Sequence, residues 1–409
     1  MTSTKNPFNI IVIVAALGYF VDIYDLILFG IVKDPSLRAI GVKEEDMFSV
    51  GTHLLDMQMI GMLLGGIVWG ILGDKKGRLS TLFLTILLYS LANIANGFVQ
   101  TVEQYEWMRF IAGFGLAGEL GVGITLVSEV MTKESRGIGT SIVSGIGIAG
   151  AVLGFLVADM FDWRIAYFVG GGLGLLLLIL RISVYESGMF HKTKQSTVKR
   201  GDFFSLFTSA NRFKKYIFCI LVGVPVWYVI SQLAIHAGTY AKEINITGTV
   251  AGAKAVMFHY IGASIGSVVF GLISERLRSR KKALCLATGS LGLFIILYFF
   301  LNGISSSLFY FIIGATGFSM GGLWAVFMAN ASEQFGTNLR ATVTTTAPNF
   351  VRGTTVLISW GIASLKTSYD LWTAGLIIGG TAIAVSLIAI FFSEETHGKD
   401  LDYVEVEEH

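Results

Sequence analysis

Several ionisable residues stand inside long apolar runs of this sequence. Asp22 and Asp25 lie in the run 9–31, Arg109 and Glu119 in the run 105–130, and Arg352 in the run 341–364. An Asp or Arg in the middle of a membrane helix costs about 2.5–3.5 kcal/mol on the insertion scale. Residues kept at such a cost usually face a cavity and mark a pathway. Their types indicate proton exchange and the binding of a charged solute.

Asp22 and Asp25 are three residues apart, so a helix places them on one face. Repulsion between two carboxylates, together with burial, favours a proton on at least one of them. We therefore expect this pair to carry a proton across the membrane. An ion pair with Arg109 is the structural alternative, and the two roles are compatible. Glu119, among glycines, is a second candidate for proton or substrate contact, with helix packing as its alternative.

Arg352 has no acidic residue in its own run. A guanidinium matches the geometry of a carboxylate, so Arg352 is expected to receive an anionic group of a substrate. Pairing with an acid on another helix is the alternative. Further candidates for a substrate site share an aromatic or ionisable side chain inside a run, although packing or interfacial roles would also explain them: Asp56, Tyr24, Trp227, Tyr228, Trp324 and His236.

The composition is that of a membrane protein. The 409 residues are 53% hydrophobic and only 14% charged, whereas a soluble domain has about 25% charged residues. The 49 glycines suit helices that approach closely in lipid. Basic residues gather in the loops, which gives no support to nucleic-acid binding. No Gly-x-Ser-x-Gly, His-Glu-x-x-His or Cys-x-x-Cys motif is present, so neither an enzyme nor a metal site is expected, and no cofactor.

A membrane helix needs about 20 apolar residues, and twelve runs approach or exceed this length. They lie near 9–31, 48–72, 79–99, 105–130, 138–160, 164–183, 216–238, 255–274, 282–302, 306–331, 341–364 and 370–393. A basic polar segment separates the sixth run from the seventh. The sequence thus predicts an N-terminal six-helix bundle (1–185), a linker (186–213), a C-terminal six-helix bundle (214–393) and a tail (394–409).

Lysine and arginine predict the orientation of the spans, because cytoplasmic loops carry an excess of both. With the N-terminus inside, most basic loop residues and the linker cluster face the cytoplasm. The outer loops then hold only Lys33, Arg38, Lys43, Arg164, Lys242, Lys254 and Lys366. Both termini are therefore expected in the cytoplasm, with the chain in the cytoplasmic (inner) membrane.

Two pairs of markers repeat about half a chain apart, which indicates an internal duplication. Gly70-Ile-Leu-Gly-Asp-Lys-Lys-Gly-Arg78 has a worn copy in Gly271-Leu-Ile-Ser-Glu-Arg-Leu-Arg278. The glycine precedes the acid, Asp74 or Glu275, by the same distance in both. Likewise Ser128-Glu129 is followed by Arg136 with the same spacing as Ser332-Glu333 by Arg340.

These features together resemble the major facilitator superfamily, whose signature loop Gly-x-Leu-Ala-Asp-Arg-x-Gly-Arg is similar to Gly70–Arg78. The resemblance implies an all-α membrane fold of twelve helices in two pseudo-symmetric bundles that work by alternating access. It implies that the loop holding Asp74 and Arg78 latches the bundles. Glu129, Arg136, Glu275, Glu333 and Arg340 are then expected to form ion pairs of the same gate. A topology-setting role for the basic loop is the alternative.

Finer motifs resemble the organic-solute and sugar symporter branches. Arg109-Phe-Ile-Ala-Gly-Phe-Gly-Leu-Ala-Gly-Glu119 resembles their fourth-span arginine motif, and the matching arginine neighbours the first-span acids in that superfamily. Asp22-Ile-Tyr-Asp25 resembles the acid-x-x-Asp of aromatic-acid and metabolite proton symporters. Tyr185-Glu-Ser-Gly-Met-Phe190 and Glu395-Thr-His-Gly398 resemble the motifs that follow the sixth and last spans of sugar porters.

We therefore expect a proton-coupled symporter of a small anionic or zwitterionic solute, such as an organic acid, an amino-acid-like metabolite or an osmolyte. Drug antiporters of the superfamily carry a Gly-Pro-rich fifth span, whereas Ser144–Gly154 has glycines but no proline, which favours uptake. An exporter or facilitator of a similar solute or of a sugar stays open, as does a membrane receptor or sensor. The expected partners are the solute, protons and the bilayer, and the expected working unit is a monomer.

Overall fold

The computed structural model describes residues 10–132, 135–180 and 201–404, with the side chains of residues 48, 49, 52, 78 and 136 left out. Helices of the first half are α1 (Ile10–Ala39), α2 (Met47–Lys76), α3 (Arg78–Asn96), α4 (Val102–Leu116), α5 (Glu119–Val130), α6 (Arg136–Ile148), α7 (Gly150–Met160) and α8 (Trp163–Leu180).

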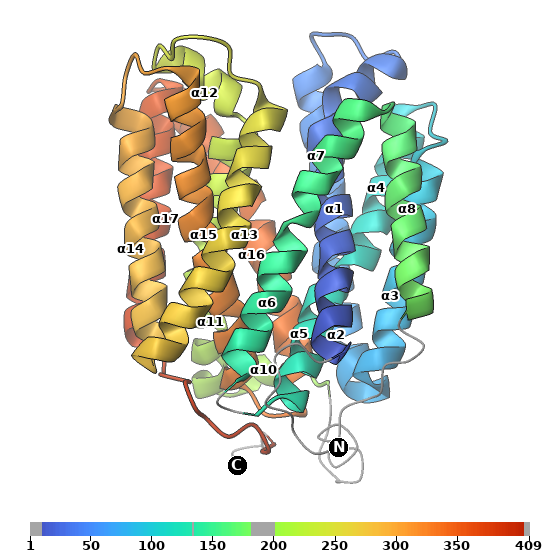
Figure 1. Ribbon diagram of the computed structural model, residues 1–409, viewed down its shortest axis with the longest axis vertical. Coiled ribbons are helices and arrows are strands. Elements are labelled where there is room, and N and C mark those ends of the chain that lie inside the picture. Colours follow the sequence, from blue (N-terminus) through green and yellow to red (C-terminus); the bar gives the residue numbers. More distant parts are fainter. Residues whose placement is uncertain (1–9, 133–134, 181–200, 405–409) are drawn as a thin grey trace.

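Helices of the second half are α10 (Ser205–Thr208), α11 (Ala210–Tyr228), the π-helix η2 (Val229–Ala234), α12 (Ala237–Glu243), α13 (Gly252–Leu277), α14 (Arg280–Phe300), α15 (Ser306–Gln334), α16 (Arg340–Leu365) and α17 (Leu371–Phe392). Figure 1 shows the two halves side by side, the first in blue to green and the second in yellow to red. We call the end where α1 begins and α10 lies the linker side, and the opposite end, with α12, the far side.

The predicted spans are confirmed as helices. Eleven helical segments of the described chain are long and apolar enough to cross a membrane, and α4–α5, α6–α7 and α11–η2 each count as one of them. The remaining predicted run, 341–364, is α16. This helix carries a run of threonines together with Asn349 and Arg352, so it is less apolar than the others. Almost every residue of 340–352 is buried, so the first half of α16 faces the interior of the bundle, whereas Leu357 and Trp360 further along are exposed.

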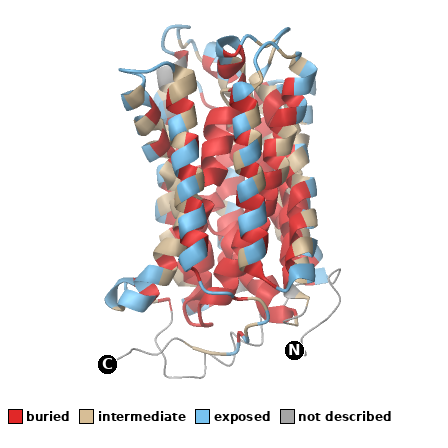
Figure 2. Ribbon diagram, turned by 90° about the vertical axis from the view of Figure 1, so that its left-hand side faces the viewer, coloured by how far each residue is buried: buried red, intermediate tan, exposed pale blue. Residues whose placement is uncertain are grey.

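The outer surface is apolar, as lipid requires. On α14 the exposed side chains include Leu286, Leu293 and Ile296, each more than half exposed. Figure 2 shows exposed stripes on the peripheral helices and a buried interior behind them. Buried positions in contrast include many polar and charged residues, Asp25 and Arg109 among them. Apolar side chains that face the lipid and polar groups in the interior are typical of a membrane protein.

Glycines bring α13 and α15 into backbone contact. A Cβ at Gly262 or Gly266 would collide with the carbonyl oxygen of Gly314 or Phe318 on α15. Gly317 of α15 is equally close to the backbone of α13. Small residues four apart on a helix permit such an approach. The packing energy of this pair therefore depends on the absence of side chains at the contact.

The first half repeats this arrangement between α2 and α4. A Cβ at Gly61 or Gly65 would collide with the carbonyl oxygen of Phe110 or Phe114, and one at Gly113 with that of Gln58. In both halves the glycines join the second span to the fourth. The sequence predicted the duplication from loop motifs, and this helix pairing has the same period.

Three spans of the described chain are each divided between two helical elements. The helix axis of span four breaks at Ala117 and Gly118, between α4 and α5, and that of span five at Ala149, between α6 and α7. Span seven contains Pro225 and continues as η2. Proline removes one backbone donor from a helix, and π-helical turns are frequent at functional sites. These interruptions make backbone groups in the membrane interior available to other partners.

The glycine contact gives a stability prediction. Gly266→Ala should lower the melting temperature of the detergent-solubilised protein by several degrees, because α13 and α15 must separate to admit the methyl group. The measurement is a thermal unfolding curve by intrinsic fluorescence. Gly289→Ala on α14 is the matched control, since nothing lies within 4 Å of a Cβ there; it should be neutral or slightly stabilising. Equal melting temperatures for the two variants would contradict the packing argument.

Candidate functional site

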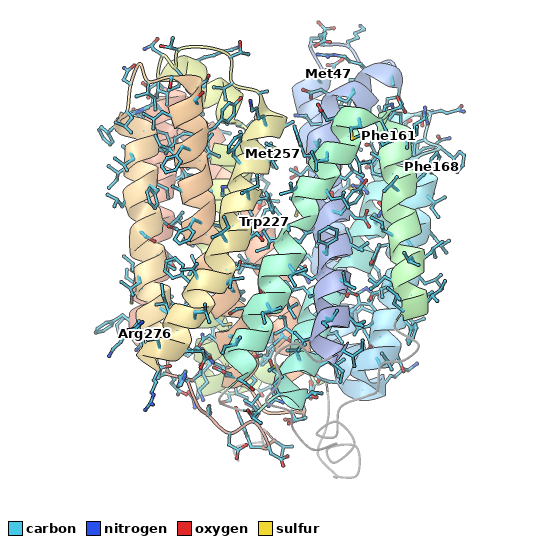
Figure 3. All side chains as sticks on the ribbon, viewed as in Figure 1. Met47, Phe161, Phe168, Trp227, Met257 and Arg276 are labelled. Atoms are coloured by element: carbon cyan, nitrogen blue, oxygen red, sulfur yellow. The ribbon has the colours of Figure 1, made fainter. Side chains whose placement is uncertain are left out.

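A small cavity of about 20 Å³ lies between the two halves. Figure 3 labels Trp227, which lines this cavity, near mid-height of the molecule; Arg276 marks the linker side and Met47 the far side. The lining comes from α1 and α6 in the first half and from α11, η2, α13, α15 and α16 in the second, and consists of Tyr19, Ile23, Leu26, Ile148, Val226, Trp227, Ile230, Tyr260, Met320, Trp324 and Arg352.

Arg352 is the charged residue of the cavity wall, and only 2% of it is exposed. Its Nη1 donates to Oδ1 of Asn349 at 2.8 Å, and its guanidinium lies 5.8 Å from the ring centroid of Trp324. Its Nε has no hydrogen-bond partner within the described ranges. A buried guanidinium with an unused donor beside an empty volume is suited to a carboxylate.

Aromatic side chains shape the rest of the wall. Trp324 donates its Nε1 hydrogen to the hydroxyl of Tyr19 at 2.9 Å, which joins α15 to α1 across the two halves. Trp227 is buried and also lines the cavity. A cavity of apolar and aromatic groups with one cation suits a ligand that has an apolar body and a single anionic group.

A second buried polar cluster surrounds Asp25 inside the first half. Asp25 is fully buried. The charge of Arg109 and the side chain of Asn93 act on it, while neither carboxylate oxygen has a hydrogen-bond partner within the described ranges. Arg109 donates to Oδ1 of Asn93 at 3.2 Å and to Oε1 of Gln58 at 3.4 Å. Gly170 of α8 leaves the room for this carboxylate, because a Cβ there would collide with Oδ1 of Asp25.

Aromatic rings cover Arg109. Its guanidinium lies 5.2 Å from the ring centroid of Tyr167 and 5.7 Å from that of Phe29. The hydroxyl of Tyr167 is 2.6 Å from that of Tyr105, which is 3.2 Å from Oγ of Ser36 toward the far side. The predicted closeness of Arg109 to a first-span acid agrees with this arrangement. Such a cluster can hold a proton on a carboxyl group beside a fixed cation.

Asp22 is also fully buried. Its charge acts on Tyr19 of the cavity wall. Glu119 is buried in the first turn of α5, just after the break between α4 and α5, and does not appear in the cavity lining. The two acids of α1 therefore have different neighbours although they share a helix face.

Two predicted substrate residues of the first half lie away from the cavity. Asp56 of α2 is partly exposed, and the charge that acts on it is that of His53. Tyr24 of α1 donates its hydroxyl hydrogen to the carbonyl of Ala166 on α8 at 2.8 Å. Neither residue lines the cavity; each interacts with a neighbour elsewhere in the first half.

Two predicted substrate residues of the second half also point elsewhere. Tyr228 donates to the carbonyl oxygen of Gly375 on α17 at 2.6 Å. Nδ1 of His236 is 2.7 Å from the carbonyl oxygen of Ser231. The cavity thus gathers Arg352, Trp227 and Trp324 from the predicted substrate set.

The linker side holds the predicted gate. Asp74, at the end of α2, accepts hydrogen bonds from the backbone N–H groups of Ala341 at 3.2 Å and Thr342 at 2.7 Å, and from the Thr342 hydroxyl at 2.7 Å. These N–H groups belong to the first turn of α16 and have no partner within that helix. A carboxylate of the first half therefore caps a helix of the second half and meets its positive dipole end.

The duplicated acid Glu275 occupies the corresponding place in the other direction. It lies near the end of α13 as Asp74 lies near the end of α2, and its Oε1 lies against Gly137 in the first turn of α6. The space at Gly137 also admits the guanidinium of Arg280. The repeat read from the sequence thus places one carboxylate from each half at the start of the fifth span of the other.

Ion pairs accompany these contacts, among them Arg280 with Glu275 at 2.7 Å. Arg340 donates to Glu129 at 3.1 Å across the two halves and to the carbonyl oxygen of Leu401 in the tail at 2.8 Å. Glu333 forms a bidentate pair with Arg280, at 2.9 and 3.0 Å, within the second half. The side chains of Arg78 and Arg136, also predicted for the gate, lie outside the described residues, as does the segment Tyr185–Phe190.

The tail after α17 docks on the same side. Glu395 accepts hydrogen bonds from the backbone N–H groups of Arg280, Lys281 and His397, and from the hydroxyl of Ser279. Burial alone would raise the pKa of Glu395, but these donors hold it below its ordinary value. The Glu-Thr-His-Gly sequence is therefore a fixed part of the linker-side network.

Sequence reasoning did not single out several residues that the structure brings to the site. Asn349, next to Arg352 on α16, and Tyr19 of the cavity wall carried no charge to attract notice. Gly170 is important through the carboxylate that it accommodates. Arg280 was assigned only to the basic loops, although its position just after Ser279 at a helix start could have suggested a partner for Glu333.

Comparison with known proteins adds an independent finding. Residues 10–352 match the family model of the Major Facilitator Superfamily. The probable 4-methylmuconolactone transporter of Cupriavidus pinatubonensis is 26% identical over 93% of this chain and 89% of its own length. The benzoate transport protein of Acinetobacter baylyi is 24% identical, covering 83% and 80% of the two chains. A putative proline/betaine transporter of Staphylococcus aureus is 28% identical over 83% and 77%.

Among solved structures, the proton:xylose symporter XylE bound to 6-bromo-6-deoxy-D-glucose superposes with a TM-score of 0.75. The match covers 96% of this chain and 97% of the other at 16% identity, so it establishes the fold alone. The relatives named here are transporters, in agreement with the prediction that the chain is not an enzyme. The duplicated helical bundle, its eleven apolar helices with the polar α16, and the family match lead to one conclusion: the chain is a multi-pass membrane transporter that belongs to the major facilitator superfamily.

Proposed function

We propose that this transporter takes up a small organic acid with an apolar body, together with a proton. The observation that carries the proposal is the cavity between the halves, whose walls are aromatic and apolar and whose charge is the guanidinium of Arg352. Asp22, Asp25 and Arg109 supply the proton-coupling part. The working unit is one chain, since the cavity is built from both halves of a single molecule.

The anchor for the substrate is Arg352. Its Nε donor is unused within the described ranges, and Nη1 is shared with a neutral amide. A carboxylate that enters the cavity gains charge-assisted hydrogen bonds without displacing another acid from this guanidinium. Trp227 and Trp324 then cover the apolar part of the ligand. Two of the named relatives, the probable 4-methylmuconolactone transporter and the benzoate transport protein, support this ligand class.

The proton carrier is assigned to Asp25. When Asp25 is ionised, Arg109 balances its charge, and Asn93 contributes a contact. When Asp25 is protonated, Arg109 keeps its bonds to Gln58 and Asn93 and its contact with Tyr167. Both protonation states therefore have neighbours that stabilise them, as a group that alternately takes up and releases a proton requires. Asp22 and Glu119 are the other candidates for the proton.

Alternating access is the transport mechanism that fits this site. The contacts of Asp74 and the pair Glu129–Arg340 hold the linker side closed, so we assign the structure to a state that opens toward the far side. The excess of basic residues on the linker side supports a cytoplasmic location for it. The division into the two bundles 1–185 and 214–393 remains a prediction and supplies the moving parts.

A zwitterionic osmolyte is the second candidate substrate. The putative proline/betaine transporter among the relatives favours it, and Trp227 and Trp324 can bind a quaternary ammonium group through their rings. The anchor for the carboxylate is the same in both cases. Parallel uptake assays with benzoate and glycine betaine distinguish the two classes.

The anchor gives the first functional prediction. Arg352→Met should reduce uptake of the transported carboxylate into proteoliposomes about ten- to hundredfold, because a charge-assisted hydrogen bond is lost from a buried site. The measurement is the initial rate of radiolabelled uptake over a range of concentrations. Lys366→Met, at the exposed end of the same helix region, is the control and should transport normally. An unchanged affinity in Arg352→Met would exclude this anchor.

The proton carrier gives the second prediction. Asp25→Asn should abolish accumulation driven by a pH gradient while sparing the exchange of labelled for unlabelled substrate, because exchange moves no net proton. Both are measured in the same proteoliposome preparation. Asp34→Asn, at an exposed position, should leave both activities intact. Full accumulation in Asp25→Asn and in Asp22→Asn would remove this pair from the mechanism.

A further inference from the structure

Asn349 makes hydrogen bonds in two directions from the middle of α16. Its Oδ1 accepts from Nη1 of Arg352 at 2.8 Å. Its Nδ2 donates to the carbonyl oxygen of Ala117 in the first half at 2.9 Å and to that of Thr345 in its own helix at 2.7 Å. Carbonyl oxygens only accept, so they fix the NH₂ group toward the interface and the oxygen toward Arg352.

The partner in the first half lies at a break in span four. Ala117 is the residue that ends α4 before α5 begins, and carbonyls at a helix end need partners outside the helix. Gly66 of α2 lies beside Asn349, and a Cβ there would be 2.7 Å from Nδ2. The amide thus fills a tight place between α2, α4 and α16, and only 1% of Asn349 is exposed.

We infer that Asn349 couples substrate binding at Arg352 to the opening of the linker side. This inference rests on the proposed role of Arg352 as the substrate anchor. A carboxylate bound at Arg352 competes with Oδ1 of Asn349 for the guanidinium. Once this bond is lost, the amide is free to rotate and its hold on Ala117 weakens. The same coupling acts in reverse, because linkage between two sites is reciprocal: opening the interface releases Asn349 and changes the affinity of Arg352.

Another hydrogen bond between the halves offers a matched control. The hydroxyls of Thr125 on α5 and Thr344 on α16 lie 2.6 Å apart, also buried. Within the described ranges the hydroxyl of Thr344 contacts that of Thr125 and backbone carbonyl oxygens, and Arg352 is not among its partners. Loss of this bond should loosen the interface without altering the link from Arg352.

A double-mutant cycle in the ligand-free protein tests the inference. Spin labels at Lys76→Cys and Arg276→Cys, both exposed on the linker side, report the ratio of open to closed molecules in nanodiscs, with Cys219 and Cys285 replaced by alanine. Arg352→Met removes the hydrogen bond to Asn349, as a bound carboxylate would, and should raise the ratio of open to closed molecules about fivefold or more. In the Asn349→Ala background the same change should have no further effect. In the Thr125→Val background it should keep its full effect.

Two results would overturn the inference: no shift on Arg352→Met, or an equal shift with and without Asn349. Asn349→Asp provides a second variant, since it keeps an oxygen toward Arg352 but sets a carboxylate against the carbonyl of Ala117; it should open the linker side more than Asn349→Ala. The cycle uses no substrate, so an additive result leaves the uptake proposal standing. A failure of carboxylate uptake likewise leaves the measured coupling intact.

Discussion

The capping of α16 by Asp74 is the contact on which the arrangement of the two halves depends. A helix that begins inside the protein has N–H groups that water does not reach, and in this structure a carboxylate from the other half satisfies them. Glu275 lies against the start of α6 in the corresponding place. Each half therefore supplies what a helix of the other half lacks. Separation on the linker side must expose these groups to water, which can replace the lost bonds there.

The same constraint organises the interior. Arg109 and Arg352 are fully buried cations, and both are held by neutral amides and aromatic rings. Amides stabilise a guanidinium without neutralising it, so the charge stays available to an incoming carboxylate or to Asp25. At the gate, by contrast, Arg340 and Arg280 are paired with carboxylates. The arginines proposed to bind substrate or to assist proton exchange are therefore held by amides, whereas the arginines that hold the linker side closed are paired with carboxylates.

Much of the fold could be predicted from the sequence, because twelve apolar runs and a repeated loop motif leave few architectures. The positions of Asp74, Glu129 and Arg340 followed from the same repeat. Side-chain directions could not be predicted: Tyr228 and Trp227 are neighbours in sequence, yet one contacts α17 and the other lines the cavity. Nor could Asn349 be recognised, since a neutral amide in an apolar run gives no signal until its three partners are known.

The glycine contacts have a mechanical consequence. Where the backbones of α13 and α15 touch, no layer of side chains is left that could slide or be repacked. The pair α13–α15 and the pair α2–α4 are each expected to move as one rigid body. Bending during the transport cycle must then occur elsewhere, at the junction between α6 and α7 and at the π-helical turn of η2. The protein thus combines rigid helix pairs with a few flexible hinges.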